Sequence, residues 1–399
     1  MNKALPRTAL VLASLGCALV AANAALARWF PLPARMYQTD PQLIYRPIPG
    51  ARSVKSAGPE GASRWVTTQI DAQGYRGPDL AVPKKGARIA VYGDSFAFAE
   101  DVPQEQTFVE RLGHALAPAS PPEMVNAGVV GYGPDQACLR MEQEFDALQP
   151  DLVVLVLCSA NDFGDLVRNK LFALDSSEKL VQNPVRCAPE LLAEFEAKAR
   201  AAEAPALVRA YRTWQAEREE RARLASGGTQ PPWIEWYLRQ ARDEYAEYVL
   251  EKKLAVRQVW QDYYDADLAL HPEWESSLYK RRLMRAVLER MRDACARRGT
   301  PFAALIVPSA IDLCPGNEIR VDPARYPSWD PARLTSTLAQ ILDELHVTQL
   351  NLYEPFRAGG AEKFFIGGGN MHWNAAGQEL AAQKLAALLS ERQLWPPKR

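Results

Sequence analysis

The chain has 399 residues, of which 48% are hydrophobic, so it can bury one large core or two smaller ones and is not intrinsically disordered. Its formal net charge is −1 at pH 7. This charge argues against nucleic acid as a partner, because proteins that bind nucleic acid need a basic surface to neutralise phosphates.

The N-terminus has the pattern of an export segment. Lys3 and Arg7 precede residues 8–27, which carry no charge and end in the small-residue sequences ANA and ALA. A basic stretch followed by about 20 apolar residues is typical of a signal peptide, and the same length could cross a bilayer as a helix. We therefore expect residues 1–27 to be a signal peptide or a transmembrane anchor, and the rest of the chain to be exported to the periplasm or cell envelope.

The next segment, residues 28–86, is rich in Pro, Gly and Arg and predicts an irregular lead-in with one short strand at WVTTQI. Five cysteines follow Cys17, without a C-x-x-C pair or a His/Cys cluster, so no structural zinc site is expected. An exported protein can form disulfides. Cys187 and Cys314 are a candidate pair because both lie in Pro-rich loop sequence.

From residue 87 onward, short apolar runs alternate with amphipathic segments. Continuous apolar strands separated by amphipathic helices predict an α/β fold, with a parallel sheet covered by helices on both faces. Sites on such sheets lie beyond the carboxyl ends of the strands. The candidate strands are residues 88–93, 123–128, 151–158, 302–309 and 348–353.

Residues 164–280 interrupt this alternation with long, highly charged stretches that favour helix. We interpret them as a helical insertion over the active end of the sheet, whose domain then comprises residues 87–163 and 281–399. Aromatic residues of the insertion could line a substrate groove or, as is commoner, form the internal seam of a helical hairpin. They are Trp214, Trp233, Trp236, Tyr237, Trp260, Tyr263 and Tyr264.

Ser95 follows the first predicted strand of the sheet, where a helix-like segment begins. A serine or aspartate there can cap the helix, but a serine can also be a nucleophile, which needs a base and an oxyanion hole. Of the four histidines, His372 lies between a Gly-rich loop and a helix that Asn374 can cap. Because this loop follows the last strand, we expect His372 and Ser95 at the same edge of the sheet.

Further candidates follow two other strands. Gly131, after the second strand, could offer a backbone N–H to an oxyanion, and Asn161, after the third, could offer its side-chain amide. Tyr132 and Trp373 are candidates for contacting the substrate. Each signal alone is common in turns and caps, but together they lie just past different strands of one sheet, which predicts a catalytic site.

These blocks resemble the SGNH (GDSL) hydrolases, a family named for Ser, Gly, Asn and His in four sequence blocks. The upstream QIDAQGYRG, residues 69–77, is similar to the N-x-x-G-[FY]-R-G lead-in of membrane-anchored members. The resemblance covers residues 66–163 and 300–390, but not the insertion. The four blocks are GDSF, NAGVVGYG, SAND and HWNAAG, which contain Ser95, Gly131, Asn161 and His372.

The resemblance implies a flavodoxin-like three-layer α/β/α fold with strand order 2-1-3-4-5. It implies Ser95 as the nucleophile and His372 as the general base. The backbone N–H groups of Ser95 and Gly131, with the side chain of Asn161, would form the oxyanion hole. The implied reaction is acyl transfer through an acyl-serine to water or to a sugar hydroxyl, without a metal or an organic cofactor.

One departure from the family concerns the residues before His372. The family usually has Asp three residues earlier, where this chain has Gly369, and the alginate-type O-acetyltransferases have Asp two residues earlier, where this chain has Asn370. In a triad this Asp fixes the imidazole tautomer and stabilises the imidazolium. Three interpretations stay open: a Ser–His dyad with a backbone carbonyl orienting His372, an acid from elsewhere in the fold, or a weakly active protein that keeps the pocket for binding.

The sequence therefore predicts a serine-dependent acyl-ester hydrolase or O-acyltransferase whose substrate is a small ester or an acylated envelope glycan. The alternative is a catalytically weak or inactive protein that binds polysaccharide in the cell envelope. The intact set of Ser95, Gly131, Asn161 and His372 favours the enzyme, because binding alone does not require a nucleophile that faces an oxyanion hole.

Overall fold

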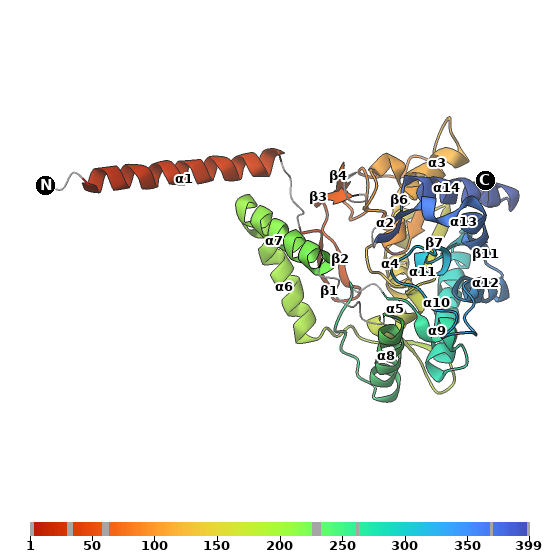
Figure 1. The fold of residues 1–399 in the computed structure, drawn as a ribbon. Helices are drawn as coiled ribbons and strands as arrows, with labels where there is room; N and C mark the ends of the chain where they lie inside the picture. Colours follow the sequence, from red (N-terminus) through yellow and green to blue (C-terminus); the bar gives the residue numbers. More distant parts are fainter. Residues whose placement is uncertain are drawn as a thin grey trace.

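The N-terminal helix extends away from a body in which helices surround a central sheet (Figure 1). This helix is α1 (Ala4–Trp29), and an 18-residue stretch within Arg7–Arg28 has a mean hydropathy of 2.1, so the helix is long and apolar enough to cross a membrane by length and composition. The expected apolar segment is therefore a helix that could be a signal or an anchor. The computed structural model describes residues 4–29, 35–57, 64–225, 233–260, 263–367 and 370–396.

The centre of the body is a five-stranded parallel sheet with the order β6–β5–β7–β10–β11. In chain order this is 2-1-3-4-5, which confirms the predicted fold class and strand order. Every residue of β5, β7 and β10 is buried, because helices cover both faces of the sheet. The strands are β5 (Arg88–Tyr92), β6 (Glu123–Asn126), β7 (Leu152–Cys158), β10 (Phe302–Val307) and β11 (Thr348–Asn351).

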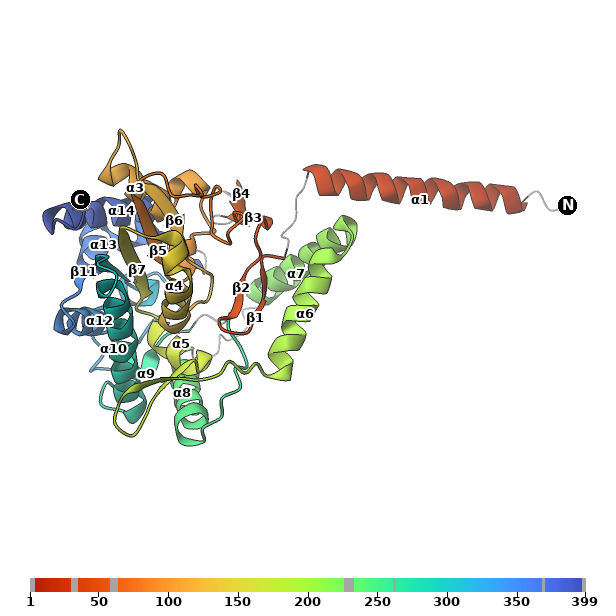
Figure 2. The same ribbon diagram turned by 180° about the vertical axis from the view of Figure 1, so that it is seen from behind.

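Two layers of helices enclose the sheet (Figures 1 and 2). On one side α3 packs against α14, and on the other α10 packs against both α4 and α12. Each of these helices follows a strand of the sheet, as the alternating pattern in the sequence predicts. Their bounds are α3 (Phe108–Leu116), α4 (Pro134–Leu148), α10 (Glu275–Ala296), α12 (Arg333–Glu344) and α14 (Ala375–Glu391).

Short elements follow the carboxyl ends of the strands, where a site is expected. The helices α2 and α11 begin directly after β5 and β10, and the hairpin β12–β13 leads into α14. Asn374 caps α14 as predicted, since its Oδ1 accepts hydrogen bonds from two backbone N–H groups of the first turn. These elements are α2 (Ser95–Phe98), η1 (Gln104–Gln106), α11 (Ala310–Leu313), α13 (Tyr353–Gly359), η3 (Ala361–Phe364), β12 (Phe365–Gly367) and β13 (Asn370–Trp373).

The lead-in differs from the irregular segment that its composition predicts. It contains two antiparallel hairpins, and the predicted strand at WVTTQI is one of their four strands. The turn residues conceal these short strands in the sequence, whereas burial of Leu43, Ile44 and Tyr45 against the body fixes the first hairpin. The strands are β1 (Tyr37–Asp40), β2 (Ile44–Pro47), β3 (Arg52–Ala57) and β4 (Arg64–Gln69).

The insertion is helical in large part, but its helices are shorter than the charged stretches suggest. The first stretch breaks at Pro205, which cannot continue a helical hydrogen-bond ladder, and the second ends at Leu250, before Lys252 adopts φ +57°. Helices α6 and α7 form a hairpin whose tip points toward α1 (Figure 2). The elements are α5 (Asp162–Asn169), β8 (Phe172–Leu174), β9 (Leu180–Gln182), α6 (Pro189–Glu203), α7 (Ala206–Ala225), α8 (Trp233–Tyr245), the π-helix η2 (Ala246–Leu250) and α9 (Ala266–Leu270).

Candidate active site

The turn after β5 presents Ser95 at the start of α2. Gly93 adopts φ +150°, and a Cβ on it would lie 2.8 Å from the carbonyl oxygen of Val156, so only glycine fits this turn. The cap of α2 is Asp94, whose Oδ1 accepts a hydrogen bond from the backbone N–H of Phe96 at 2.9 Å. Because Asp94 caps the helix, the hydroxyl of Ser95 is available for another partner.

That partner is His372, whose Nε2 lies 2.7 Å from the Oγ of Ser95. Its Nδ1 lies 2.9 Å from the Oδ1 of Asn370, and the same oxygen accepts the backbone N–H of His372 at 2.9 Å. The backbone N–H of His372 can only donate, so the atom of Asn370 that faces it must be the amide oxygen and not the amide nitrogen. The proton of the neutral imidazole then lies on Nδ1, which leaves Nε2 as the acceptor for the serine hydroxyl. Gly369, the other position that departs from the family pattern, lies outside the described residues.

A carboxylate from another part of the fold also approaches His372. The Oδ2 of Asp101 lies 3.7 Å from Nδ1, and the side chain of Asp101 is only 7% exposed. Sequence reasoning did not single out this residue, because an acidic residue shortly after a helix has no motif that sets it apart. The geometry favours the interpretation in which an acid comes from elsewhere, with Asn370 rather than a backbone carbonyl orienting the imidazole.

The two other predicted oxyanion residues differ in their placement. Asn161 lines the same cavity as Ser95, and its Nδ2 donates to the Oδ2 of Asp165 at 2.8 Å. An amide nitrogen carries two hydrogens, so one remains for an oxyanion. Gly131 does not line this cavity in the described part of the chain. It adopts φ +77°, and a Cβ on it would lie 2.5 Å from the carbonyl oxygen of Val259, in the insertion.

Tyr132 and Trp373, the predicted substrate contacts, are core residues instead, each only 1% exposed. The hydroxyl of Tyr132 donates to the backbone carbonyl of Tyr45 at 2.5 Å. The ring of Trp373 packs against Phe96 and Phe356, with ring centres 5.2 and 5.4 Å apart. Large aromatic side chains next to a motif are buried here because the hairpins and short helices around the sheet edge pack on them.

The cavity beside Ser95 is small, at about 40 Å³. Residues after β5, β7 and β10, together with β13, form its walls, as expected for a site at the carboxyl edge of the sheet. The insertion contributes Tyr263, whose ring stacks on Trp236 with centres 5.7 Å apart and lies 3.6 Å from the guanidinium carbon of Arg168. The other wall residues include Cys158, Ala160, Tyr263, Ala310 and Met371.

The aromatic residues of the insertion have mixed environments, so neither sequence interpretation covers them all. Trp233, Trp236 and Tyr237 pack with Tyr263 in one cluster, as a seam would. Trp214, in contrast, is 52% exposed.

Buried carboxyls lie behind the cavity. Burial raises the pKa of Asp165 to about 8, although the neighbouring Arg168 lowers it. Burial, followed by the charge of Asp94, raises the pKa of Asp162, whose Oδ2 accepts the backbone N–H of Cys158 at 2.8 Å. Burial therefore shifts both groups toward the protonated form, which reduces the negative charge behind a developing oxyanion.

The structure does not support the predicted disulfide, because all six cysteines are free thiols. The backbone of Cys187 is bridged to Val256 in the insertion, whereas Cys314 ends α11 at the sheet edge. Within the described ranges, no group of three or more His, Cys, Asp or Glu side chains could hold a metal ion.

No family model matches the sequence, and no curated protein matches it. A lipase/acylhydrolase from Enterococcus faecalis is similar in structure, with 12% identity and a TM-score of 0.37 over 78% of this chain and 99% of that one. The psychrotrophic esterase EstA from Pseudoalteromonas sp. has 12% identity and a TM-score of 0.36 over 77% and 98% of the two chains. A structure described as a lipolytic protein of the G-D-S-L family, from Desulfitobacterium hafniense, has 9% identity and a TM-score of 0.34 over 76% and 99%. The chain is similar in fold to SGNH/GDSL lipases and acylhydrolases.

Proposed function

We propose that the protein is a serine acyl-ester hydrolase with Ser95 as nucleophile and His372 as general base. One observation carries this proposal: the Oγ of Ser95 lies 2.7 Å from the Nε2 of His372, while Asn370 holds the Nδ1 of the same ring at 2.9 Å. A nucleophile, a base and a group that orients the base are the parts that acyl transfer requires.

In the first half of the reaction, the Oγ of Ser95 attacks the ester carbonyl carbon and His372 accepts the hydroxyl proton at Nε2. The imidazolium that forms is stabilised by the carboxylate of Asp101, 3.7 Å from Nδ1. When the tetrahedral intermediate collapses, the bond between the former carbonyl carbon and the oxygen of the leaving alcohol breaks. The leaving alcohol takes the proton from Nε2, and the acyl group remains on Ser95.

The negative charge of the tetrahedral intermediate needs donors that are already in position. The backbone N–H of Ser95 and the second amide hydrogen of Asn161 supply them, and the bond from Asn161 to Asp165 holds that amide in place. The backbone N–H of Gly131 is the third donor of this proposal, because the close carbonyl oxygen of Val259 excludes only a side chain at this position.

In the second half, water or a hydroxyl of an acceptor loses a proton to Nε2 of His372 and attacks the acyl carbon. The bond between this carbon and the Oγ of Ser95 then breaks, and Oγ takes the proton back from Nε2. Water as acceptor gives hydrolysis, and a sugar hydroxyl gives O-acyl transfer. The cavity of about 40 Å³ favours a short acyl group such as acetyl, because a single water molecule already needs about 10 to 15 Å³ of such a cavity. With α1 as a signal or anchor, the substrate is an ester outside the cytoplasm, and an acylated envelope glycan fits this class.

The test uses the full chain in detergent, p-nitrophenyl acetate as substrate and a fluorophosphonate as a covalent probe of the nucleophile. We expect turnover that Ser95→Ala abolishes, and a mass increase on the peptide that contains Ser95. Ser309 is the internal comparison, because it lines the same cavity but its Oγ caps α11 by accepting the N–H of Ile311. Label on Ser309 and not on Ser95 would overturn the proposal. Absence of both label and turnover would favour the inactive, polysaccharide-binding alternative.

A further inference from the structure

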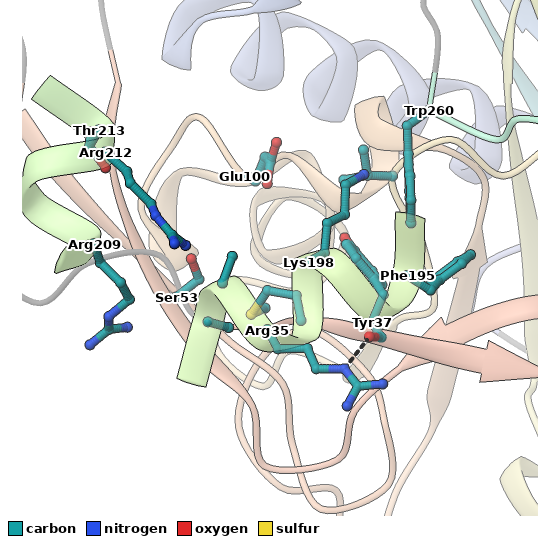
Figure 3. A pocket seen from close by; sticks show the side chains of 14 residues that line it. Arg35, Tyr37, Ser53, Glu100, Phe195, Lys198, Arg209, Arg212, Thr213 and Trp260 are labelled. Atoms are coloured by element: carbon teal, nitrogen blue, oxygen red, sulfur yellow. Dashed lines mark hydrogen bonds between the residues drawn. The ribbon is translucent and has the colours of Figure 1, made fainter. Parts of the chain in front are cut away.

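A second cavity, of about 550 Å³, lies between the lead-in and the α6–α7 hairpin (Figure 3). This volume is in the range of cavities that bind small molecules. Four cationic side chains and one acidic side chain line it, which gives a formal charge of four minus one, or +3. The charged residues are Arg35, Lys198, Arg209, Arg212 and Glu100.

Among the described residues, three of the cations have no acidic partner. Lys198 pairs with Glu194 at 2.7 Å, but the described part of the chain contains no ion pair of Arg35, Arg209 or Arg212. The Nε of Arg209 is shielded from solvent and has no hydrogen-bond partner among the residues that the structure describes. Figure 3 shows Arg209 and Arg212 projecting from α7, and Arg35 from the lead-in. Guanidinium groups that outnumber the single carboxylate of a cavity select an anion, and their planar fork matches a phosphate or a carboxylate.

The position of the cavity relative to α1 indicates the source of this anion. The backbone N–H of Leu207, at the start of α7, donates to the Oδ1 of Asn23 at 3.2 Å, so the tip of the hairpin touches α1. Asn23 precedes the end of the apolar stretch at Arg28 by five residues, or about 7.5 Å of helix. With α1 across a bilayer, the contact at Asn23 therefore places the start of α7 within about 7.5 Å of the headgroup level, and Arg209 follows Leu207 by two residues.

The outer face of α7 supports the same placement. Val208, Tyr211 and Trp214 recur every three residues and are 38%, 60% and 52% exposed. The rings of Tyr211 and Trp214 lie 6.0 Å apart, and the guanidinium of Arg218 lies over Trp214. Exposed aromatic and apolar side chains beside arginines are typical of helices at a membrane interface.

We propose that this cavity, formed by the lead-in and the α6–α7 hairpin, binds the phosphate headgroup of an anionic membrane lipid and so holds the hairpin on the membrane surface. A lipid fits better than an acidic glycan, because sugars stack on free aromatic faces. Lys198 covers Trp260, and the aromatic residues that α7 exposes do not line the cavity. Glu100 and Val130, which line the cavity, directly precede Asp101 and Gly131, so the lipid adjoins the loops of the candidate active site. This inference does not depend on the chemistry of Ser95.

The test is calorimetric titration of the full chain in dodecyl maltoside with dioctanoylphosphatidylglycerol. Dioctanoylphosphatidylcholine measures partition of the acyl chains alone. We expect saturable binding of the anionic lipid only, and a Kd about thirty-fold weaker in the Arg209→Gln/Arg212→Gln variant. The matched control is Arg239→Gln/Arg242→Gln, which removes the same charge from exposed positions of α8 and is expected to keep the parent Kd.

Two further titrants separate the sources of the anion. Inorganic phosphate that binds as tightly as the lipid would replace the proposal with a free-phosphate site, and trigalacturonate that binds in place of the lipid would replace it with a glycan site. Equal Kd values for the parent and the Arg209→Gln/Arg212→Gln variant would overturn the proposal outright. If that variant does not fold, as its thermal unfolding will show, Arg35→Gln on the opposite wall supplies the same comparison.

Discussion

Replacing Asp101 by Asn tests what stabilises the imidazolium of His372. The two charges lie 3.7 Å apart. Coulomb's law gives about 4.5 kcal/mol at an effective dielectric constant of 20 and about 1 kcal/mol in bulk water for that distance. The side chain of His372 is 26% exposed and that of Asp101 is 7% exposed, so we take about 2 to 3 kcal/mol between these limits. Asp101→Asn should therefore lower kcat about 30- to 150-fold.

The assay is steady-state hydrolysis of p-nitrophenyl acetate by the full chain in detergent. The matched control is Glu105→Gln, which removes the same charge four residues away at an exposed position of η1. We expect the control to retain the parent kcat. Asp101→Asn should lower kcat with little change in KM, because the imidazolium forms only during the reaction.

A rescue variant separates this electrostatic role from a merely structural one. Asn370 lies 2.9 Å from Nδ1, so Asn370→Asp in the Asp101→Asn background returns a carboxylate to the ring and should restore most of the lost rate. The reasoning is refuted if Asp101→Asn keeps kcat within about two-fold of the parent, as weak exposed ion pairs do. It is also refuted if the double variant stays as slow as Asp101→Asn alone.

Three further predictions concern the acyl cavity, a buried acid and the nucleophile turn. Because the cavity is only about 40 Å³, kcat/KM for p-nitrophenyl acetate should be about ten-fold or more above kcat/KM for p-nitrophenyl octanoate. Met371→Ala should enlarge the cavity and so reduce the ratio of these two kcat/KM values. Equal kcat/KM values for the two esters in the parent would contradict the acetyl assignment. Burial raises the pKa of Asp312 to about 7, so this carboxyl group destabilises the folded state only where the unfolded chain would ionise it. The destabilisation is absent below about pH 4, grows as the pH rises and is constant above about pH 7. Asp312→Asn should remove roughly 4 kcal/mol or less of the change in the free energy of unfolding between these pH values, as measured by urea unfolding. A variant whose free energy of unfolding changes with pH as much as that of the parent would count against the raised pKa of Asp312. Gly93→Ala should destabilise the protein by about 1 to 3 kcal/mol, because the new Cβ would lie 2.8 Å from a backbone oxygen. Gly86→Ala, whose Cβ would have no atom within 4 Å, should keep the parent Tm. A Gly93→Ala variant as stable as the parent would show that the turn can relax.

The sheet and the edge at which the candidate site lies could be predicted from the order of residues along the chain. Apolar runs such as β7 predict buried strands because each strand must match the apolar helices on both faces. Parallel strands end at the same edge, so Ser95 and His372 could be placed near each other from their position after a strand. Their side chains are 2.7 Å apart in the structure.

The other groups around His372, and the cavity between the α6–α7 hairpin and the lead-in, could not be predicted in this way and are known from the folded structure. Asp101 reaches Nδ1 and Trp373 turns into the core through packing between elements that are far apart in the chain. Arg35 and Arg209 likewise share one cavity only because α6 and α7 fold back onto the lead-in. Periodicity and caps arise from contacts within a few residues and can be predicted locally. Distances between side chains on different elements depend on how the whole core packs, so they become defined only in the folded chain.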